Sequence, residues 1–272
     1  MQGKTVLVTG ANAGIGFGVA AGLAQMGARV VMVARNRQKG ETAQADIQQK
    51  TGNADVHLLL ADLSEMVQIH ALAKDFRAQF DALHVLVNNA AVIPQQRTES
   101  PDGYEMQFAV NHLAYFLLTN LLLDVLIQSA PARIVNVSSG VHFGGRINFD
   151  DLHSKKSYRP TGVYANTKLM NVMFTYELAR RLNGRGVTVN AVHPGEIATQ
   201  LHNDWYGEPP GTPFWGRSIE DGARTPLYAA TAPELDGVTG QYFSNERQTR
   251  GTADDVTVAA RLWQVSEQLT GL

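Results

Sequence analysis

Residues 5–16 read Thr-Val-Leu-Val-Thr-Gly-Ala-Asn-Ala-Gly-Ile-Gly, and a helical pattern follows them to about Met26. The apolar start of this stretch is typical of a strand that is buried on both faces. A strand, a glycine-rich turn and a helix in this order form the context that a dinucleotide-binding turn needs. Gly10 allows the tight turn, Gly14 lets backbone amides approach a pyrophosphate, and Gly16 lets the helix pack close to the strand. The spacing differs from the commoner G-x-G-x-x-G, so a plain glycine-rich turn is the alternative.

Apolar runs and helical patterns alternate along the rest of the chain. We expect further strands at 29–34, 56–60, 83–87, 133–137, 187–192 and 241–243. We expect helices at 38–50, 64–80, 104–126, 164–182, 219–230 and 256–269. Ser64 is expected to cap its helix, and Ser218 with Asp221 suits a capping box. This alternation predicts an α/β fold over residues 1–272: a single-domain, Rossmann-type doubly wound sheet of about seven parallel strands with helices on both faces.

The composition bounds the classes of function. The chain has 272 residues, 44% of them hydrophobic and 18% charged, with a net charge of −2. No basic block stands out, so nucleic acid and anionic membranes are not expected partners. The absence of cysteine excludes disulfides, thiolate catalysis and cysteine-ligated metals. A strand begins directly after Lys4, and polar residues interrupt the apolar run 113–127. We therefore expect no signal peptide, no membrane span and a cytoplasmic location.

The carboxyl ends of the strands are where a parallel sheet of this kind binds its ligand. Enzymes that use NAD usually carry an acidic residue at the end of the second strand, where this chain has Ala34 followed by Arg35, with Arg37 nearby. A guanidinium in place of a carboxylate suits a 2′-phosphate, so the sequence favours NADP. Merely solvated arginines are the alternative interpretation. Asp62, at the end of the third strand, could meet the adenine edge.

Asparagines mark two further positions. Asn88-Asn89-Ala90-Ala91 follows the fourth strand, and its small and amide side chains suit the close approach of a cofactor. A structural turn is the equal alternative for Asn88. Asn111 lies inside an apolar helix, which is costly unless its side chain is hydrogen-bonded. It is either a buried polar group or a site for an ordered water.

Tyr164 and Lys168 are four residues apart, so they share one face of the predicted helix. A phenol has a pKa near ~10, which is too high for easy proton transfer near neutrality. An ammonium one turn away favours the phenolate and is expected to lower that pKa. A surface pair on a helix is the alternative for this spacing taken alone.

Residues 196–216 are rich in proline, glycine and aromatic side chains, the latter being Trp205, Tyr206, Phe214 and Trp215. This composition suits a mobile lid over an apolar substrate, with an ordinary loop as the alternative. His142 and His193 match no metal-site spacing, so we expect structural or pocket-lining histidines.

Taken together, these motifs resemble the short-chain dehydrogenase/reductase family over nearly the whole chain. The carrying residues are Thr9 to Gly16, Asp62, Asn88-Asn89-Ala90, Asn111, Ser138-Ser139, Tyr164 to Lys168, Pro194-Gly195 and Thr199. Within the family, the retinol dehydrogenase and WW-domain oxidoreductase branch is similar at Asn111-His112-Leu113, Val192 to Gly195, Asp221 to Ala223 and Gly240 to Phe243. The N-terminal membrane segment of many retinol dehydrogenases has no counterpart in this sequence, so a membrane-bound retinoid role is not expected.

The resemblance implies a role for each matching residue. Tyr164 is the general acid or base, Lys168 lowers its pKa and binds the nicotinamide ribose, and Ser139 donates a hydrogen bond to the substrate carbonyl. Asn111 holds a water that links Lys168 to solvent. Thr199 bonds the nicotinamide carboxamide. The implied cofactor-binding residues are Gly10, Asn12, Gly14, Ile15, Gly16, Arg35, Asp62, Leu63, Asn89, Ala90, Tyr164, Lys168, Pro194, Gly195 and Thr199.

The function that these roles imply is the NADPH-dependent reduction of an apolar aldehyde or ketone. A catalytically silent NADP-binding regulator is the first alternative, because the fold hosts such proteins. Reduction of a carbon–carbon double bond, as in the similar protochlorophyllide reductases, is the second, although their active-site cysteine is missing. Apolar residues in the helices at 111–126 and 171–182 exceed what one sheet face needs, so we expect a homodimer or homotetramer.

Overall fold

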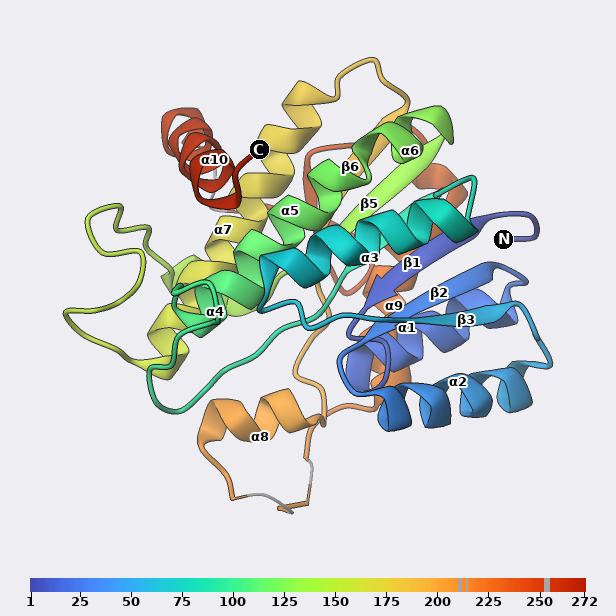
Figure 1. Cartoon of the computed structure of the whole chain (residues 1–272), viewed down its shortest axis with the longest axis horizontal. Helices are drawn as coiled ribbons and strands as arrows, with labels where there is room; N and C mark the ends of the chain where they lie inside the picture. Colours follow the sequence, from blue (N-terminus) through green and yellow to red (C-terminus); the bar gives the residue numbers. More distant parts are fainter. Residues whose placement is uncertain (210–211, 214, 252–254) are drawn as a thin grey trace.

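A twisted sheet of eight strands crosses the molecule, with the strand order β3-β2-β1-β4-β5-β6-β7-β8 (Figure 1). The computed structural model describes residues 1–209, 212–213, 215–251 and 255–272. The strands are β1 (Thr5–Thr9), β2 (Arg29–Ala34), β3 (Val56–Leu60), β4 (Val85–Asn88), β5 (Ala132–Val137), β6 (Val187–His193), β7 (Gln241–Ser244) and β8 (Arg247–Thr249). β1 to β7 are parallel, as predicted, and the order reverses between β1 and β4.

β8 was not expected from the sequence. It pairs antiparallel with β7 through a two-residue turn, Asn245-Glu246, in which both residues have positive φ. Such a turn matches the twist of a hairpin, and asparagine tolerates the left-handed conformation whereas glutamate rarely adopts it. The Glu246 side chain pairs with Arg224 of the neighbouring helix, with Oε1 2.7 Å from Nε.

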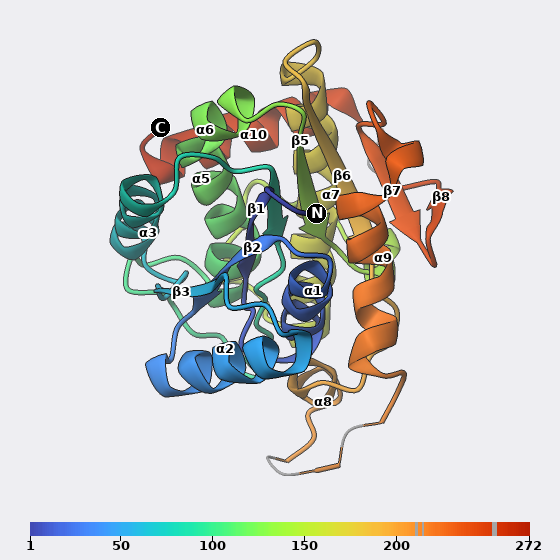
Figure 2. The ribbon, with the colours of Figure 1, turned by 90° about the vertical axis from the view of Figure 1, so that its right-hand side faces the viewer.

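Helices cover both faces of the sheet (Figure 2). One face packs against α1 (Gly14–Gln25), α2 (Arg37–Thr51) and α9 (Ile219–Thr231). The other packs against α3 (Met66–Gln79), α5 (Ala114–Leu121), α6 (Leu123–Gln128) and α7 (Pro160–Arg181). α10 (Val256–Thr270) lies outside on α7. Leu7 faces one core and Val6 and Val8 the other, all fully buried, which explains the uninterrupted apolar run of β1.

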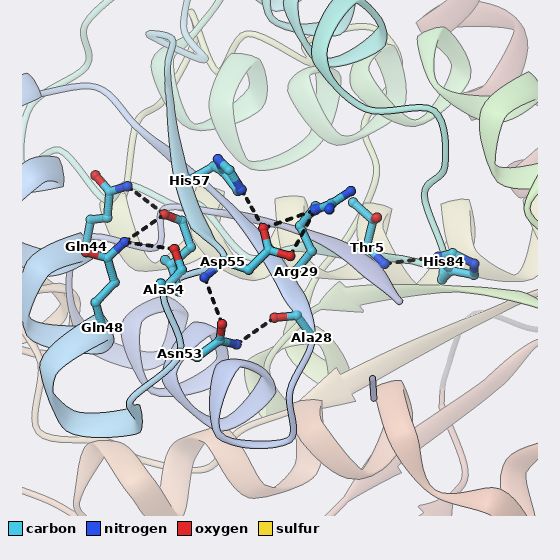
Figure 3. A network of polar contacts seen from close by, with 11 residues as sticks. Thr5, Ala28, Arg29, Gln44, Gln48, Asn53, Ala54, Asp55, His57 and His84 are labelled. Atoms are coloured by element: carbon cyan, nitrogen blue, oxygen red, sulfur yellow. Dashed lines mark hydrogen bonds and ion pairs between the residues drawn. The ribbon is translucent and has the colours of Figure 1, made fainter. Parts of the chain in front are cut away.

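Polar contacts fix the edge of the sheet at β2 and β3 (Figure 3). The Asp55 carboxylate accepts from Arg29 Nε at 3.1 Å and lies 2.7 Å from His57 Nε2. The Asn53 amide donates to the carbonyls of Ala24 and Ala28, both at 2.9 Å. These contacts join the start of β3 to the start of β2, and so set the register in which both strands run toward the ligand edge.

Two helix starts differ from the expectation, and the start of α9 agrees with it. α3 begins at Met66, and Ser64 does not cap it, because its hydroxyl donates to Asp62 Oδ1 at 2.7 Å. Asp102 from a distant loop instead accepts from the Met66 amide at 2.8 Å. α7 begins at Pro160, where a missing N–H costs nothing in the first turn. The Ser218 half of the capping box is confirmed, since its hydroxyl accepts from the Asp221 amide at 3.1 Å.

The long helix expected at 104–126 is wrong as a single helix. It consists of α4 (Met106–Phe108), a π-helical turn η1 (Ala109–Leu113), α5 and α6. Short helices also occur within segments expected as loops: η2 (Gly140–Gly144), α8 (Gln200–Tyr206) and η3 (Pro233–Leu235). None of the helices in the described ranges combines the length and apolarity needed to cross a membrane.

The C-terminal helix α10 covers much of the apolar surface on α5 and α7 from which we expected an oligomer. Trp263 of α10 contacts Phe116 of α5 at 4.8 Å and Phe174 of α7 at 5.9 Å between ring centroids. Leu262 of α10 is buried in the same layer as Met170 and Met173. α10 of the same chain therefore covers part of the apolar surface from which the homodimer or homotetramer was expected. The oligomer stays a prediction.

Candidate active site

The turn between β1 and α1 is shaped for close backbone approach. Gly10 and Gly14 have φ values of +64° and +53°, which side chains rarely adopt. A Cβ on Gly16 would overlap the Gly10 carbonyl oxygen and come within 2.5 Å of Asn89 Nδ2. A Cβ on Gly14 would meet the Thr199 methyl group at 3.1 Å. The three predicted glycines thus form a tight cradle at the α1 N-terminus that a side chain at any of them would distort, and this shape fits a pyrophosphate.

Thr9 joins the two strands between which the order reverses. Its hydroxyl accepts from the amides of Asn89 at 2.8 Å and Ala90 at 3.1 Å. The Asn89 side chain donates to the Thr9 carbonyl at 2.8 Å. Asn88 is a buried structural residue, which resolves its two alternatives, because its amide donates to Thr119 Oγ1 and Asn136 Oδ1, both at 2.9 Å. Asn89 and Ala90 therefore lie where the strand order reverses, and Asn88 stabilises the sheet by hydrogen bonds in the core.

Arg35 and Asp62 lie side by side at the ends of β2 and β3. Arg35 Nη1 is 3.7 Å from Asp62 Oδ2, and the Arg35 side chain is 72% exposed. The other Asp62 oxygen accepts from the amide and hydroxyl of Ser64. Arg37 is directed to Glu41, with Nη1 3.3 Å from Oε1. Arg35 is thus the guanidinium that remains available beside the position where an adenosine ribose would lie.

The two serines at the end of β5 have different environments. Ser138 is buried, and its hydroxyl donates to the Lys168 carbonyl at 2.8 Å. Ser139 is half-buried, and among the described residues its oxygen accepts only a long contact of 3.4 Å from the Val141 amide. The Ser139 hydroxyl hydrogen is therefore free to serve a ligand, whereas that of Ser138 is committed to α7.

Tyr164 and Lys168 lie on one face of α7, as predicted, but both are buried. Lys168 is 1% exposed and donates from Nζ to the Val137 carbonyl at 2.9 Å. Its Nζ lies 5.3 Å from the centre of the Tyr164 ring. Within the described part of the chain, the Tyr164 hydroxyl forms no hydrogen bond, which leaves it free for a substrate.

Burial reverses the expected effect on the phenol. We expected Lys168 to lower the pKa of Tyr164, but desolvation raises that pKa above its usual value. Desolvation also lowers the pKa of Lys168 to about 7, so its positive charge is only partly held at neutral pH. The ammonium points to the Val137 carbonyl and stands over the ring of Tyr164, so it forms no hydrogen bond with the phenol oxygen.

Asn111 lies in the π-helical turn, a conformation that often marks functional sites. Its amide accepts from the Val92 N–H at 2.8 Å and donates to the Val92 carbonyl at 3.0 Å and to Thr167 Oγ1 at 3.2 Å. Asn111 thus ties the segment after β4 to α7 beside Lys168. Asn111 is thus a buried polar group whose amide is hydrogen-bonded within the protein. The ordered water that it was expected to hold stays a prediction.

A cavity of about 390 Å³ lies at the carboxyl ends of the strands and brings eight of the predicted residues together. Its lining includes Ile15, Asn89, Ser139, Tyr164, Lys168, Pro194, Gly195 and Thr199. α8 closes it from the other side with Trp205 and Tyr206, and Thr199 caps α8 by accepting from the His202 amide. His193 lines the cavity, as expected. Phe214, also predicted for this lid, lies outside the described residues.

Other predicted residues lie away from this cavity. Arg35 and Asp62 are at the neighbouring strand ends, Asn12 is in the glycine-rich turn, and the Leu63 side chain is buried in the core. The sequence reasoning missed the apolar wall, formed by Ile93, Val141, Ile197 and Leu201. It also missed Tyr115, whose ring faces Lys168. Its position four residues after Asn111 was the available signal.

Comparisons with known proteins agree with this geometry. A family model described as short chain dehydrogenase matches residues 4–209. The chain is 44% identical to retinol dehydrogenase 11 of Homo sapiens, over all of this chain and 87% of that protein. Its structure is similar to an uncharacterised protein of Mycobacterium paratuberculosis, with a TM-score of 0.80, 34% identity, and coverage of 99% and 94% of the two chains. It is also similar to RhlG of Pseudomonas aeruginosa, which was solved as an NADP active-site complex. The TM-score is 0.72, the identity is 26%, and the match covers 90% of this chain and 95% of RhlG.

Proposed function

The chain belongs to the short-chain dehydrogenase family, in its retinol dehydrogenase-like branch, and we propose that it is an NADPH-dependent reductase of apolar aldehydes or ketones. The observation that carries this proposal is the convergence of Ser139, Tyr164 and Lys168 on one cavity next to the glycine-rich turn. Trp205, Tyr206, Leu201 and Ile93 give that cavity an apolar wall, which suits an apolar substrate.

The cofactor would bind along the carboxyl edge of the sheet. The cradle at Gly10, Gly14 and Gly16 fits the pyrophosphate, and Arg35 fits a 2′-phosphate. RhlG, solved with NADP in its active site, supports the same choice. When bound, a nicotinamide dinucleotide supplies the hydride. Thr199, Pro194 and Gly195 would hold the nicotinamide end, beside Ile15.

The side chains of this chain supply position and the proton. Ser139 would donate its free hydroxyl hydrogen to the substrate carbonyl oxygen and so fix the reacting group. Tyr164 would give its phenolic proton to the same oxygen as negative charge develops there. The phenol of Tyr164 is protonated at neutral pH, as a proton donor must be, and burial, which raises its pKa, keeps it so. Lys168 would stabilise the phenolate that remains.

The test is the loss of NADPH absorbance against a panel of apolar aldehydes and ketones, retinal among them, with NADH alongside. We expect turnover with the wild type, a loss of at least about 100-fold in Tyr164→Phe, since acid catalysis contributes that much, and weaker turnover with NADH. Tyr228→Phe, a half-buried tyrosine on α9 outside the cavity, is the matched control. Tight NADPH binding without turnover of any carbonyl would favour the regulator instead.

A further inference from the structure

Lys168 carries its charge in a place that offers little to stabilise it. The side chain is 1% exposed, and its single hydrogen bond in the described structure goes to the Val137 carbonyl at 2.9 Å. An ammonium has three donors, and a buried charge is costly unless it is compensated. A further favourable contact is needed if Lys168 is to remain charged at working pH.

The side chains around Lys168 provide no carboxylate for this purpose. Burial lowers its pKa, and no acidic side chain in the described ranges forms an ion pair with it. The titratable groups that face it or share its cavity are Tyr164 from its own helix, Tyr115 from α5, and His193, Glu196, His202 and Tyr206 from the cavity wall.

Two aromatic rings remain, one on α7 itself and one on α5. Lys168 Nζ lies over the Tyr164 ring at 5.3 Å and over the Tyr115 ring at 5.7 Å from the centroids. Both distances are within the roughly 6 Å over which a ring face attracts a cation. The Tyr115 hydroxyl is buried and has no hydrogen-bond partner in the described structure, so only the ring of Tyr115 can serve Lys168.

We propose that the ring of Tyr115 is a positioning element that keeps the buried Lys168 ammonium charged by a cation–π contact. The proposal rests on the proposed function and deepens it. Tyr115 would control the charge of Lys168, the cationic partner of the general acid Tyr164, without touching substrate or cofactor. Tyr115 is 1% exposed and its ring is fixed by packing in the core that α5 shares with the sheet.

Two substitutions separate the ring from the hydroxyl. Tyr115→Phe keeps the ring face and removes the unpaired hydroxyl, whereas Tyr115→Leu removes the ring. The readout is the dependence of kcat/KM on pH with NADPH and a carbonyl substrate. Lys168 loses its proton as pH rises, so its ionisation sets a limb on the alkaline side. We expect this limb to move to lower pH by about one unit in Tyr115→Leu and to stay in place in Tyr115→Phe.

The proposal is overturned if the Tyr115→Leu limb coincides with that of the wild type, or if Tyr115→Phe moves as far as Tyr115→Leu. Circular dichroism checks the fold, and Tyr115→Met is the second aliphatic variant if leucine is not tolerated. The NADPH dissociation constant, measured by fluorescence over the same pH range, gives the same comparison without turnover. A wild type that binds NADPH but reduces no carbonyl would contradict the proposed function, while this binding titration would still decide the role of Tyr115.

Discussion

The indole of Trp205 stands edge-on to the phenol of Tyr164, with the ring centroids 5.8 Å apart and the planes at 71°. Trp205 lies on α8, a helix of seven residues that Thr199 caps, and Tyr164 lies on α7 below the sheet edge. The contact places α8, which closes the cavity, directly against Tyr164, the proposed proton donor. A substrate carbonyl that reaches Tyr164 must therefore pack beside this indole.

Replacing that indole should change which substrates the enzyme prefers. In Trp205→Ala we expect kcat/KM for compact carbonyls to fall roughly 10- to 100-fold, because a lost apolar contact costs about 1–3 kcal/mol. Bulkier carbonyls should lose less or gain. Trp215→Ala is the control, since Trp215 contacts Tyr206 and His202 rather than Tyr164. Equal losses across substrates of all sizes would contradict a role of Trp205 in shaping the cavity.

The choice between the two dinucleotides should depend on Arg35. In Arg35→Asp we expect NADPH affinity to fall by roughly 10- to 100-fold, because a charge-assisted hydrogen bond contributes about 1.5–3 kcal/mol, while NADH affinity stays constant or rises. Arg37→Asp makes the same charge change two residues away, where the guanidinium pairs with Glu41. Titration of intrinsic fluorescence gives both dissociation constants. Unchanged NADPH affinity in Arg35→Asp would remove the phosphate-binding role.

The strands could be predicted because their information is local. β2 occupies the expected residues, since buried parallel strands need continuous apolar runs and this run is visible in the sequence. The glycine-rich turn and the Tyr164 to Lys168 spacing are local for the same reason. The π-helical turn at Asn111 is not, because it depends on Val92 and Thr167, which are distant along the chain.

The electrostatics of the site could not be predicted for a related reason. The spacing of Tyr164 and Lys168 shows that they share a helix face but not that α5, α8 and the sheet bury both. Burial decides the direction of both pKa shifts, so the pKa of Tyr164 is raised although it was expected to be lowered. The apolar partners of a side chain come from tertiary packing, which local periodicity does not specify.

The closeness of α1 to β1 should make Gly16 intolerant of any side chain. In Gly16→Ala the new Cβ would overlap the Gly10 carbonyl and crowd Asn89 Nδ2 at 2.5 Å, so the turn must open. We expect at least about 1–3 kcal/mol of destabilisation, typical of overpacking, and a loss of NADPH binding. Gly162→Ala is the control, because its Cβ would meet only Arg159 Cβ at 3.6 Å. Thermal melts with and without NADPH measure both effects, and wild-type binding by Gly16→Ala would be the contrary result.

The charge of Lys168 should cost stability that an apolar side chain recovers. Burial lowers its pKa from 10.5 to about 7, so the unfolded chain binds this proton more tightly than the folded one. The penalty is complete below pH 7, where the buried amine is charged, and it disappears as pH rises toward 10.5. Lys168→Met should therefore raise the free energy of unfolding by about 1–4 kcal/mol at pH 6, by clearly less at pH 9.5, and abolish turnover.

Urea denaturation at the two pH values measures this difference. Lys74→Met, on the exposed side of α3, removes a lysine that is already solvated and should change stability little at either pH. The decisive quantity is the gain of Lys168→Met at pH 6 minus its gain at pH 9.5, which must be positive if the buried ammonium is the cause. A gain that is the same at both pH values would mean that packing, and not charge, distinguishes methionine from lysine at this position.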